Sequence, residues 1–415
     1  MAVLRKFKAI RPKEGLEKQV ASFPYDVINS EEAREIASGN PFSFLHINKP
    51  EIDLPEDTDL YSQEVYDMAK ANFERFRAEG TLITEETPKL YVYRQTMDGR
   101  EQYGIVGCAF VGDYDNDIIK KHEHTRKKKE EDRIKHVDVT NANAGPIFLT
   151  YKSKETINNI VNEVVKGKPV YDFVADDGIG HTVWIIESDS TSDILIEEFA
   201  KIDYLYVADG HHRSASAAKV ANMRKEKNPN HTGNEEYNYF LAVYFPDEQL
   251  KIMDYNRVVI DLNGNTEEEF FTKIQETVTC EEIGASEYRP AKKGEFAMYM
   301  DKKWYRLTVK DGIVDLNDPV NSLDTAVLQA NILNPILGID DPRTSERIDF
   351  IGGIRGLKEL VRLVDSGKFK VAFALYPTSI LELMNIADAG EVMPPKSTWF
   401  EPKLRSGLLV HTLED

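Results

Sequence analysis

The sequence contains few cysteines and no long apolar segment, and both shortages narrow the class of protein. Cysteine accounts for 2 of the 415 residues, Cys108 and Cys280. They could form one disulfide, but nothing indicates a secreted disulfide framework, and we expect buried free thiols. No stretch approaches the roughly 18 apolar residues that a membrane-spanning helix needs. A hydrophobic segment of signal-peptide length is also missing near Met1. The sequence therefore predicts a soluble, cytoplasmic protein with no membrane partner.

Basic residues are outnumbered by acidic ones. The chain has 52 Lys and Arg against 71 Asp and Glu, a formal net charge of -19. A surface this negative repels a phosphate backbone, which argues against nucleic acid as a partner. It leaves room for a small positive pocket that binds a single anion. With 41% hydrophobic residues, the chain has the material for a core, and its length favours about two or three domains.

Predicted strands and helices intermix along the chain without regular alternation, which indicates an α+β fold. Strands are expected at 90–95 and 103–111, joined by a turn at Asp98-Gly99. A long amphipathic helix is expected over 60–79, and a shorter one follows an N-cap at Asn29 or Ser30. We expect 239–245 and 251–260 to be paired strands. We place a domain boundary at 265, with domains at 1–265 and 266–415.

The sharpest motif follows a short predicted strand, Tyr204 to Val207. It reads Asp209-Gly210-His211-His212-Arg213 and continues into a helix of small residues, expected from Ser214. Gly210 permits a sharp turn, and the first N–H groups and dipole of the helix favour an anion. Arg213 offers a planar fork of donors, while His211 and His212 can add donors or move a proton.

Another interpretation is that Asp209 only caps the helix and that the basic residues are solvated. Two imidazoles and a guanidinium at a helix start are costly unless an anion compensates them, which favours an anion site. The anion site requires space beside Arg213, and it fails if an internal ion pair consumes this guanidinium and leaves no room.

The segment Gly210 to Arg213, with Asp209 before it and small residues after it, resembles the G-x-x-R phosphate-binding box of the ParB and sulfiredoxin superfamily. The wider pattern resembles domain-of-unknown-function family 1015, proteins of bacteria and archaea. Four more stretches carry this resemblance: Phe23 to Ile28, His122 to Thr125 with Asp132-Arg133, Gly145 to Phe148, and Met393 to Thr398. One departure is Asn256-Arg257, where the family pattern leads us to expect His-Arg.

The resemblance implies a ParB/sulfiredoxin-like nucleotide-binding core with a mixed sheet, followed by a C-terminal α+β region. Sulfiredoxins need a cysteine inside the box, where this chain has His211, and ParB proteins need a DNA-binding helix-turn-helix that is not evident here. The branch that remains is the free-serine kinases. It implies a phosphotransferase that uses Mg²⁺ with ATP, ADP, CTP or pyrophosphate, and free L-serine is the best guess for its small-molecule substrate. A non-catalytic nucleotide-dependent switch is the alternative, and a homodimer is left open.

The segment from Lys120 to Arg133 holds a second cluster. On a strand, His122 and His124 would share one face, and such a pair could bind zinc. Mg²⁺ prefers carboxylate and phosphate oxygens, so we expect Glu123 to hold this ion against nucleotide phosphates. Thr125 and Arg133 would then contact phosphate. The alternative is a solvated charged loop or helix.

Other candidate residues come from the two ends of the chain. Asp26 could take the proton from a substrate hydroxyl, with Glu31 or Glu32 as substitutes, or it could simply cap a helix. His212 and Asp209 are the other candidate catalytic residues. Lys396 and Ser397 follow two prolines and are expected to line the nucleotide pocket.

Overall fold

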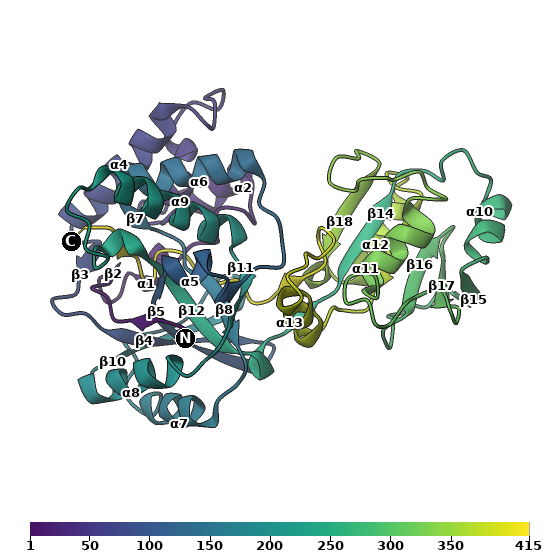
Figure 1. Ribbon diagram of the computed structural model, residues 1–415. Helices are drawn as coiled ribbons and strands as arrows, with labels where there is room; N and C mark the ends of the chain where they lie inside the picture. The colour runs from purple at the N-terminus through teal and green to yellow at the C-terminus, as the bar shows by residue number, and fades with distance from the viewer. Residues whose placement is uncertain (415) are drawn as a thin grey trace. The chain divides into compact units, whose positions relative to one another are not determined.

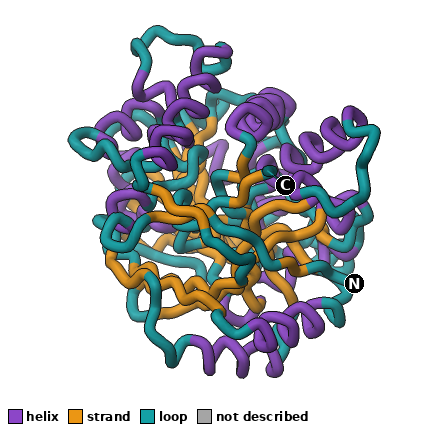
Figure 2. The backbone as a smooth tube through the Cα atoms, turned by 90° about the vertical axis from the view of Figure 1, so that its left-hand side faces the viewer, coloured by secondary structure: helices purple, strands orange, loops and turns teal. Residues whose placement is uncertain are grey.

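The computed structural model describes residues 1–414 and divides the chain into two compact units (Figure 1). The first unit comprises Met1–Leu250 together with the C-terminal residues from Pro402 onward, and the second comprises Lys251–Glu401. Strands and helices intermix along the chain in both units. The tube in Figure 2 shows strands with helices on either side of them. The predicted α+β class is confirmed.

The first unit is built on one mixed sheet of nine strands. The hydrogen-bonded order is β6-β11-β8-β12-β5-β4-β10-β9, and β1 also pairs with β5. The pairs β6–β11 and β8–β12 are parallel, and the others are antiparallel. The strands are β1 (Leu4–Arg5), β4 (Leu90–Met97), β5 (Arg100–Phe110), β6 (Ile119–Lys120), β8 (Ile147–Tyr151), β9 (Tyr171–Val174), β10 (Gly180–Ile186), β11 (Leu205–Asp209) and β12 (Tyr239–Pro246).

Helices cover both faces of this sheet, with α4, α6 and α9 on one side and α7 and α8 on the other (Figure 1). The apolar core contains residues of the strands together with buried side chains of α7, α8 and α9. The helices are α1 (Glu17–Val20), α2 (Ser30–Ala37), α3 (Leu45–Asn48), α4 (Gln63–Ala78), α5 (Val111–Asp115), α6 (Lys127–Thr140), α7 (Glu155–Val164), α8 (Asp189–Phe199) and α9 (His211–Lys227).

Local sequence signals account for several of these elements. Asp98 and Gly99 both have positive φ, 53° and 75°, and form the predicted turn between β4 and β5. The side chain of Asn29 accepts a hydrogen bond from the Glu32 amide, and Glu32 accepts one from the Asn29 amide, so a capping box starts α2. The carboxylate of Glu32 therefore caps the helix, which makes Glu32 a poorer candidate than Asp26 for the catalytic base.

The second unit contains an antiparallel sheet of six strands in the order β15-β17-β16-β19-β14-β18. Helix α11 continues into a π-helical turn at Gln329–Leu333. The elements are β14 (Tyr255–Val259), β15 (Val278–Gly284), β16 (Glu295–Met300), β17 (Lys303–Val309), β18 (Ile348–Gly352), β19 (Val371–Leu375), the short pair β13 (Ile252–Met253) and β20 (Trp399–Phe400), and the helices α10 (Glu267–Ile274), α11 (Asp324–Leu328), α12 (Leu357–Asp365) and α13 (Ile380–Asp388).

The expected pairing of 239–245 with 251–260 is wrong. Strand β12 pairs with β5 and β8 in the first unit, whereas β14 pairs with β18 and β19 in the second. The units therefore divide after Leu250 and not at 265. Two apolar runs close in sequence look like a hairpin, and nothing local shows that each completes a different sheet.

The end of the chain returns to the first unit. Strand β21 (His411–Thr412) pairs with β7 (Ala142–Asn143), and a further short pair joins β2 (Ile10–Pro12) to β3 (Leu82–Thr84). Cys108 and Cys280 are both free thiols. Within residues 1–414, none of the helices combines the length and the apolar character needed to cross a bilayer.

Candidate functional site

The motif at 209–213 forms a tight turn between β11 and α9. Gly210 has φ 100° and ψ 30°, a left-handed conformation that disfavours other residues. A Cβ at this position would lie 3.1 Å from Nε of Arg213. Gly210 is therefore required both by the turn and by the close approach of the guanidinium. The helix starts at His211, earlier than the expected start at Ser214.

Arg213 is buried and forms an internal ion pair. Its Nη2 donates to Oδ2 of Asp209 at 2.7 Å, and its Nη1 donates to the carbonyl of Pro146. Lys403 lies on the other side of this carboxylate, with Nζ 3.2 Å from Oδ1 of Asp209. Burial alone would raise the pKa of Asp209, but the charges of Lys403 and Arg213 outweigh burial and hold the pKa below its usual range. Asp209 is thus an anchor for two cations.

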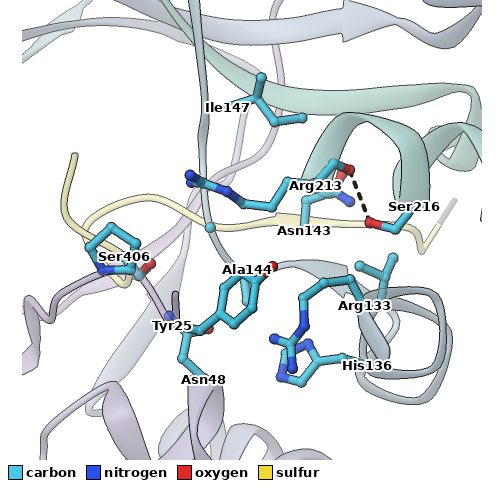
Figure 3. Close-up of a pocket in the computed structure, with 13 residues that line it drawn as sticks. Tyr25, Asn48, Arg133, His136, Asn143, Ala144, Ile147, Arg213, Ser216 and Ser406 are labelled. Atoms are coloured by element: carbon cyan, nitrogen blue, oxygen red, sulfur yellow. Dashed lines mark hydrogen bonds between the residues drawn. The ribbon is translucent and has the colours of Figure 1, made fainter. Parts of the chain in front are cut away.

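The ion pair does not fill the space beside Arg213. A small cavity of about 30 Å³, open to solvent, is lined by Arg213, Arg133, His136 and Tyr25, together with Asn143 to Gly145 and Ser406 (Figure 3). In Figure 3, Arg133 and His136 lie side by side near the ring of Tyr25, and Arg213 extends from α9. The Nε of Arg213 is buried and has no hydrogen-bond partner. The room left beside this guanidinium is that of about one or two water molecules, and the guanidinium is not free, so the requirement for room is met only in part.

Tyr25 contributes an unpartnered hydroxyl to the cavity. Its ring stacks with Arg133, whose guanidinium carbon lies 4.1 Å from the ring centroid. The hydroxyl is buried without a hydrogen-bond partner, and burial, assisted by Asp26, raises the pKa of Tyr25. Arg133 also pairs with its neighbour Asp132, which in turn accepts a bond from the hydroxyl of Tyr66. A buried polar atom without a partner is costly, and a ligand atom here would remove the cost.

A second cleft adjoins this cavity and shares Tyr25, Asn48, Arg133 and His136 with it. Its volume is about 200 Å³ and it too is open to solvent. Asp26 lines this cleft, with an exposed side chain. Arg213 therefore lines the cavity, Asp26 lines the adjoining cleft, and Arg133 lines both.

His211 and His212 are not arranged as charged phosphate donors. The Nε2 of His212 accepts the backbone N–H of Arg126 at 3.0 Å, and the Nε2 of His211 lies 3.5 Å from the backbone nitrogen of His122 as its acceptor. A ring nitrogen that accepts an N–H carries no proton. Burial lowers the pKa of both side chains, that of His211 to about 4. Both imidazoles are neutral at physiological pH.

The segment 121–126 is a loop between β6 and α6. The interpretation that His122 and His124 share one face of a strand is therefore wrong. His122 is buried and its ring meets that of His211 edge to face, with centroids 4.4 Å apart, while His124 is exposed. The hydroxyl of Thr125 donates to Glu130 at 2.5 Å. The carboxylate of Glu123 lies 3.8 Å from Nδ1 of His211. Among residues 1–414, no three His, Cys, Asp or Glu side chains are grouped so that they could hold a metal ion.

Lys396 and Ser397 belong to the second unit, and their role in the pocket stays a prediction. The hydroxyl of Ser397 bonds to that of Thr325 at 2.9 Å, and the carbonyl of Lys396 accepts from Arg257 at 2.9 Å. Asn256 stands where the family pattern has histidine. It is buried, donates to Asp254 at 2.6 Å and accepts the amide of Leu375 at 3.0 Å, so it joins β14 to β19.

Several residues of the site were missed. Lys403 and Ser406 lie in the C-terminal segment that returns to the first unit, and no local sequence pattern predicts this return. Tyr25 belongs to a motif that we singled out, but the sequence does not show that its hydroxyl lacks a partner. His136 lies one helical turn after Arg133 on α6, a spacing that places both on one face of the helix and could have indicated it.

Proteins similar to this chain are found among solved structures and in one protein family, whereas no curated protein matches the sequence significantly. A free serine kinase in complex with AMP is 16% identical, covering 73% of this chain and 91% of that chain, with a TM-score of 0.37. A conserved hypothetical protein from Pyrococcus furiosus is 16% identical over 74% of this chain and 95% of its own, with a TM-score of 0.35. SbnI with C-terminal truncation from Staphylococcus aureus is 11% identical over 74% and 87%, with a TM-score of 0.38. The profile of the family described as "Protein of unknown function (DUF1015)" matches residues 4–326, and this chain therefore belongs to that family, as its motifs indicated.

Proposed function

We propose that the first unit binds a nucleotide through its phosphates and transfers a phosphoryl group to a hydroxyl of a small metabolite. One observation carries this proposal: two guanidinium groups, Arg133 and Arg213, line one cavity with the buried, unpartnered hydroxyl of Tyr25. Each guanidinium is paired with one carboxylate, yet each has five N–H donors, so donors remain for phosphate oxygens.

The reaction requires a base near the acceptor hydroxyl, and Asp26 is our candidate. It is an exposed carboxylate in the cleft that adjoins the cationic cavity. In the proposed step the acceptor oxygen forms a bond to the terminal phosphorus, the bond from that phosphorus to the bridging oxygen breaks, and the acceptor proton passes to Asp26. The nucleotide leaves with one phosphoryl group fewer. Positioning and charge neutralisation supply most of the rate in such transfers.

Mg²⁺ fits this proposal as an ion that arrives with the nucleotide. It commonly takes one or two carboxylates from the protein and completes its shell with phosphate oxygens and water. Glu123 is the carboxylate that we assign to it, and its side chain is 46% exposed and faces His211. When bound, the ion would neutralise part of the phosphate charge. Free L-serine, which the motif resemblance implies, is the proposed acceptor.

The direct test is to mix the protein with Mg²⁺, L-serine and one donor at a time from ATP, ADP, CTP and pyrophosphate. Phosphorus NMR should then show O-phosphoserine with at least one donor. Arg133→Gln should weaken nucleotide binding by on the order of tenfold or more, because a charge-assisted hydrogen bond contributes roughly 1.5–3 kcal/mol. Arg126→Gln is the matched control, since it removes an exposed positive charge at the start of the same helix.

The outcomes separate two functions. Product formation supports the kinase. Nucleotide binding without a product from any acceptor tried supports the non-catalytic switch, and absence of binding of every donor contradicts both.

A further inference from the structure

The two histidines at the start of α9 hold the loop 121–126 in place from two points. Arg126 donates its backbone N–H to Nε2 of His212 at 3.0 Å, at one end of the loop. Near the other end, the backbone nitrogen of His122 faces Nε2 of His211 at 3.5 Å. Both acceptors belong to consecutive residues of one helix turn. The loop is thus attached to α9 by side chains that lie 86 and 89 positions further along the chain.

The other side of His211 faces the carboxylate of Glu123. Because Nε2 is the acceptor, the neutral ring carries its proton on Nδ1, which lies 3.8 Å from Oε2 of Glu123. The ring of His122 packs edge to face on the same imidazole. One imidazole therefore contacts the loop backbone, a loop ring and the loop carboxylate.

We propose that His211 and His212 are positioning residues that fasten the loop 121–126 to α9, and so hold Glu123 toward a nucleotide-bound cation. This inference rests on the proposed function for the role of Glu123, but the attachment of the loop itself does not. It replaces the expectation that both histidines contact phosphate. The geometry supports it because the Nε2 atoms, which would have to face a phosphate as donors, already accept backbone N–H groups.

Amide hydrogen exchange of the unliganded protein tests the attachment. His212→Ala should speed exchange in 121–126 by about tenfold, the effect of losing one hydrogen bond, and leave β8 and β12 unchanged. His212→Gln should restore slow exchange, because the glutamine side-chain oxygen can occupy the position of Nε2. His124→Ala is the matched control, a histidine on the same loop whose side chain is exposed.

The attachment is refuted if His212→Ala exchanges like the wild type, if His212→Gln behaves like His212→Ala, or if His124→Ala has an equal effect. Should His212→Ala unfold the unit, exchange will rise in β8 and β12 as well. In that case His212→Asn replaces His212→Ala as the test variant, because the asparagine side chain is too short to reach the position of Nε2.

Binding of ADP, with Mg²⁺ and in its absence, tests the positioning of Glu123. His212→Ala should weaken Mg²⁺-dependent ADP binding by about tenfold and leave binding in EDTA unchanged, whereas a merely structural loss would weaken both. An unchanged Mg²⁺-dependent affinity with a loosened loop overturns the positioning role. If the wild type binds no ADP at all, the proposed function fails, and the exchange experiment still decides whether the histidines hold the loop.

Discussion

Lys403 and Asp209 are 194 positions apart in the sequence, yet Nζ of Lys403 lies 3.2 Å from Oδ1 of Asp209. The same carboxylate accepts from Arg213 through its other oxygen. One acidic side chain at the end of β11 therefore links the C-terminal segment to the first turn of α9. This link places the guanidinium at the edge of the cavity.

Lys403→Met should destabilise the first unit at pH 7 by about 1–3 kcal/mol. The lysine side chain is 13% exposed and that of Asp209 28%, so the loss should fall between those of surface and buried ion pairs. Urea unfolding followed by circular dichroism measures the change. Lys168→Met, at an exposed lysine of the same unit, should alter the free energy of unfolding by less than about 0.5 kcal/mol. Equal effects of the two substitutions would show that the contact with Asp209 contributes nothing.

Gly210→Ala should reduce both stability and nucleotide binding. An alanine is strained at this left-handed φ of 100°, and its Cβ would lie 3.1 Å from Nε of Arg213, so the guanidinium must shift by a few tenths of an ångström. Gly178→Ala is the control, because Gly178 has φ 82° and a Cβ added there would meet no other atom within 4 Å. Calorimetry should show a loss of about 1–3 kcal/mol for Gly210→Ala, with ADP affinity lost only in this variant. If Gly210→Ala kept the ADP affinity of the wild type, the guanidinium of Arg213 would have no role in nucleotide binding.

Elements with local signals were predictable from the sequence. The turn at Asp98-Gly99 needs positive φ at both residues, and the start of α2 needs the capping pair Asn29 and Glu32, so a few neighbouring residues determine each of them. The sheet partners of β12 and β14 were not predictable in this way. Their sequences show only that both are buried strands, and the choice of sheet depends on residues far along the chain.

The candidate site was predictable at Gly210 and Arg213 but not at the two histidines between them. The helix-dipole argument treats His211 and His212 as cations that need an anion. In the structure burial keeps both neutral, and the loop 121–126 supplies N–H donors in place of an anion. A single sequence shows neither the burial of an imidazole nor the loop that covers it.

Tyr25→Phe should strengthen the fold and weaken the ligand complex. The substitution keeps the ring that stacks with Arg133 and removes a buried hydroxyl that has no partner. The unfolding free energy should rise by up to about 1 kcal/mol, and ADP affinity should fall by about tenfold. Tyr91→Phe is the control, since Tyr91 also has a buried unpartnered hydroxyl but does not line the cavity. Equal ADP affinities in the two variants would mean that the hydroxyl of Tyr25 contacts no ligand.

Asp324→Asn should stabilise the second unit at neutral pH and much less in acid. Asp324 is buried, its Oδ2 has no partner, and burial raises its pKa to about 7, although Oδ1 accepts the Gly294 amide at 2.9 Å. The folded state thus holds the proton more tightly than the unfolded state, whose pKa is about 3.9. Stability of the wild type should therefore fall as the pH rises from about 4 to 7 and level off above.

The asparagine variant cannot ionise, so its advantage over the wild type should grow through the same pH window. The upper limit is about 4 kcal/mol, three pKa units at roughly 1.4 kcal/mol each. Unfolding monitored by tryptophan fluorescence at pH 5 and pH 8 measures the advantage, because Trp304 and Trp399 lie in the second unit. Asp311→Asn, at an exposed position of this unit, should show no such pH dependence. An advantage of Asp324→Asn that is equal at both pH values would mean that the buried carboxyl does not titrate between them.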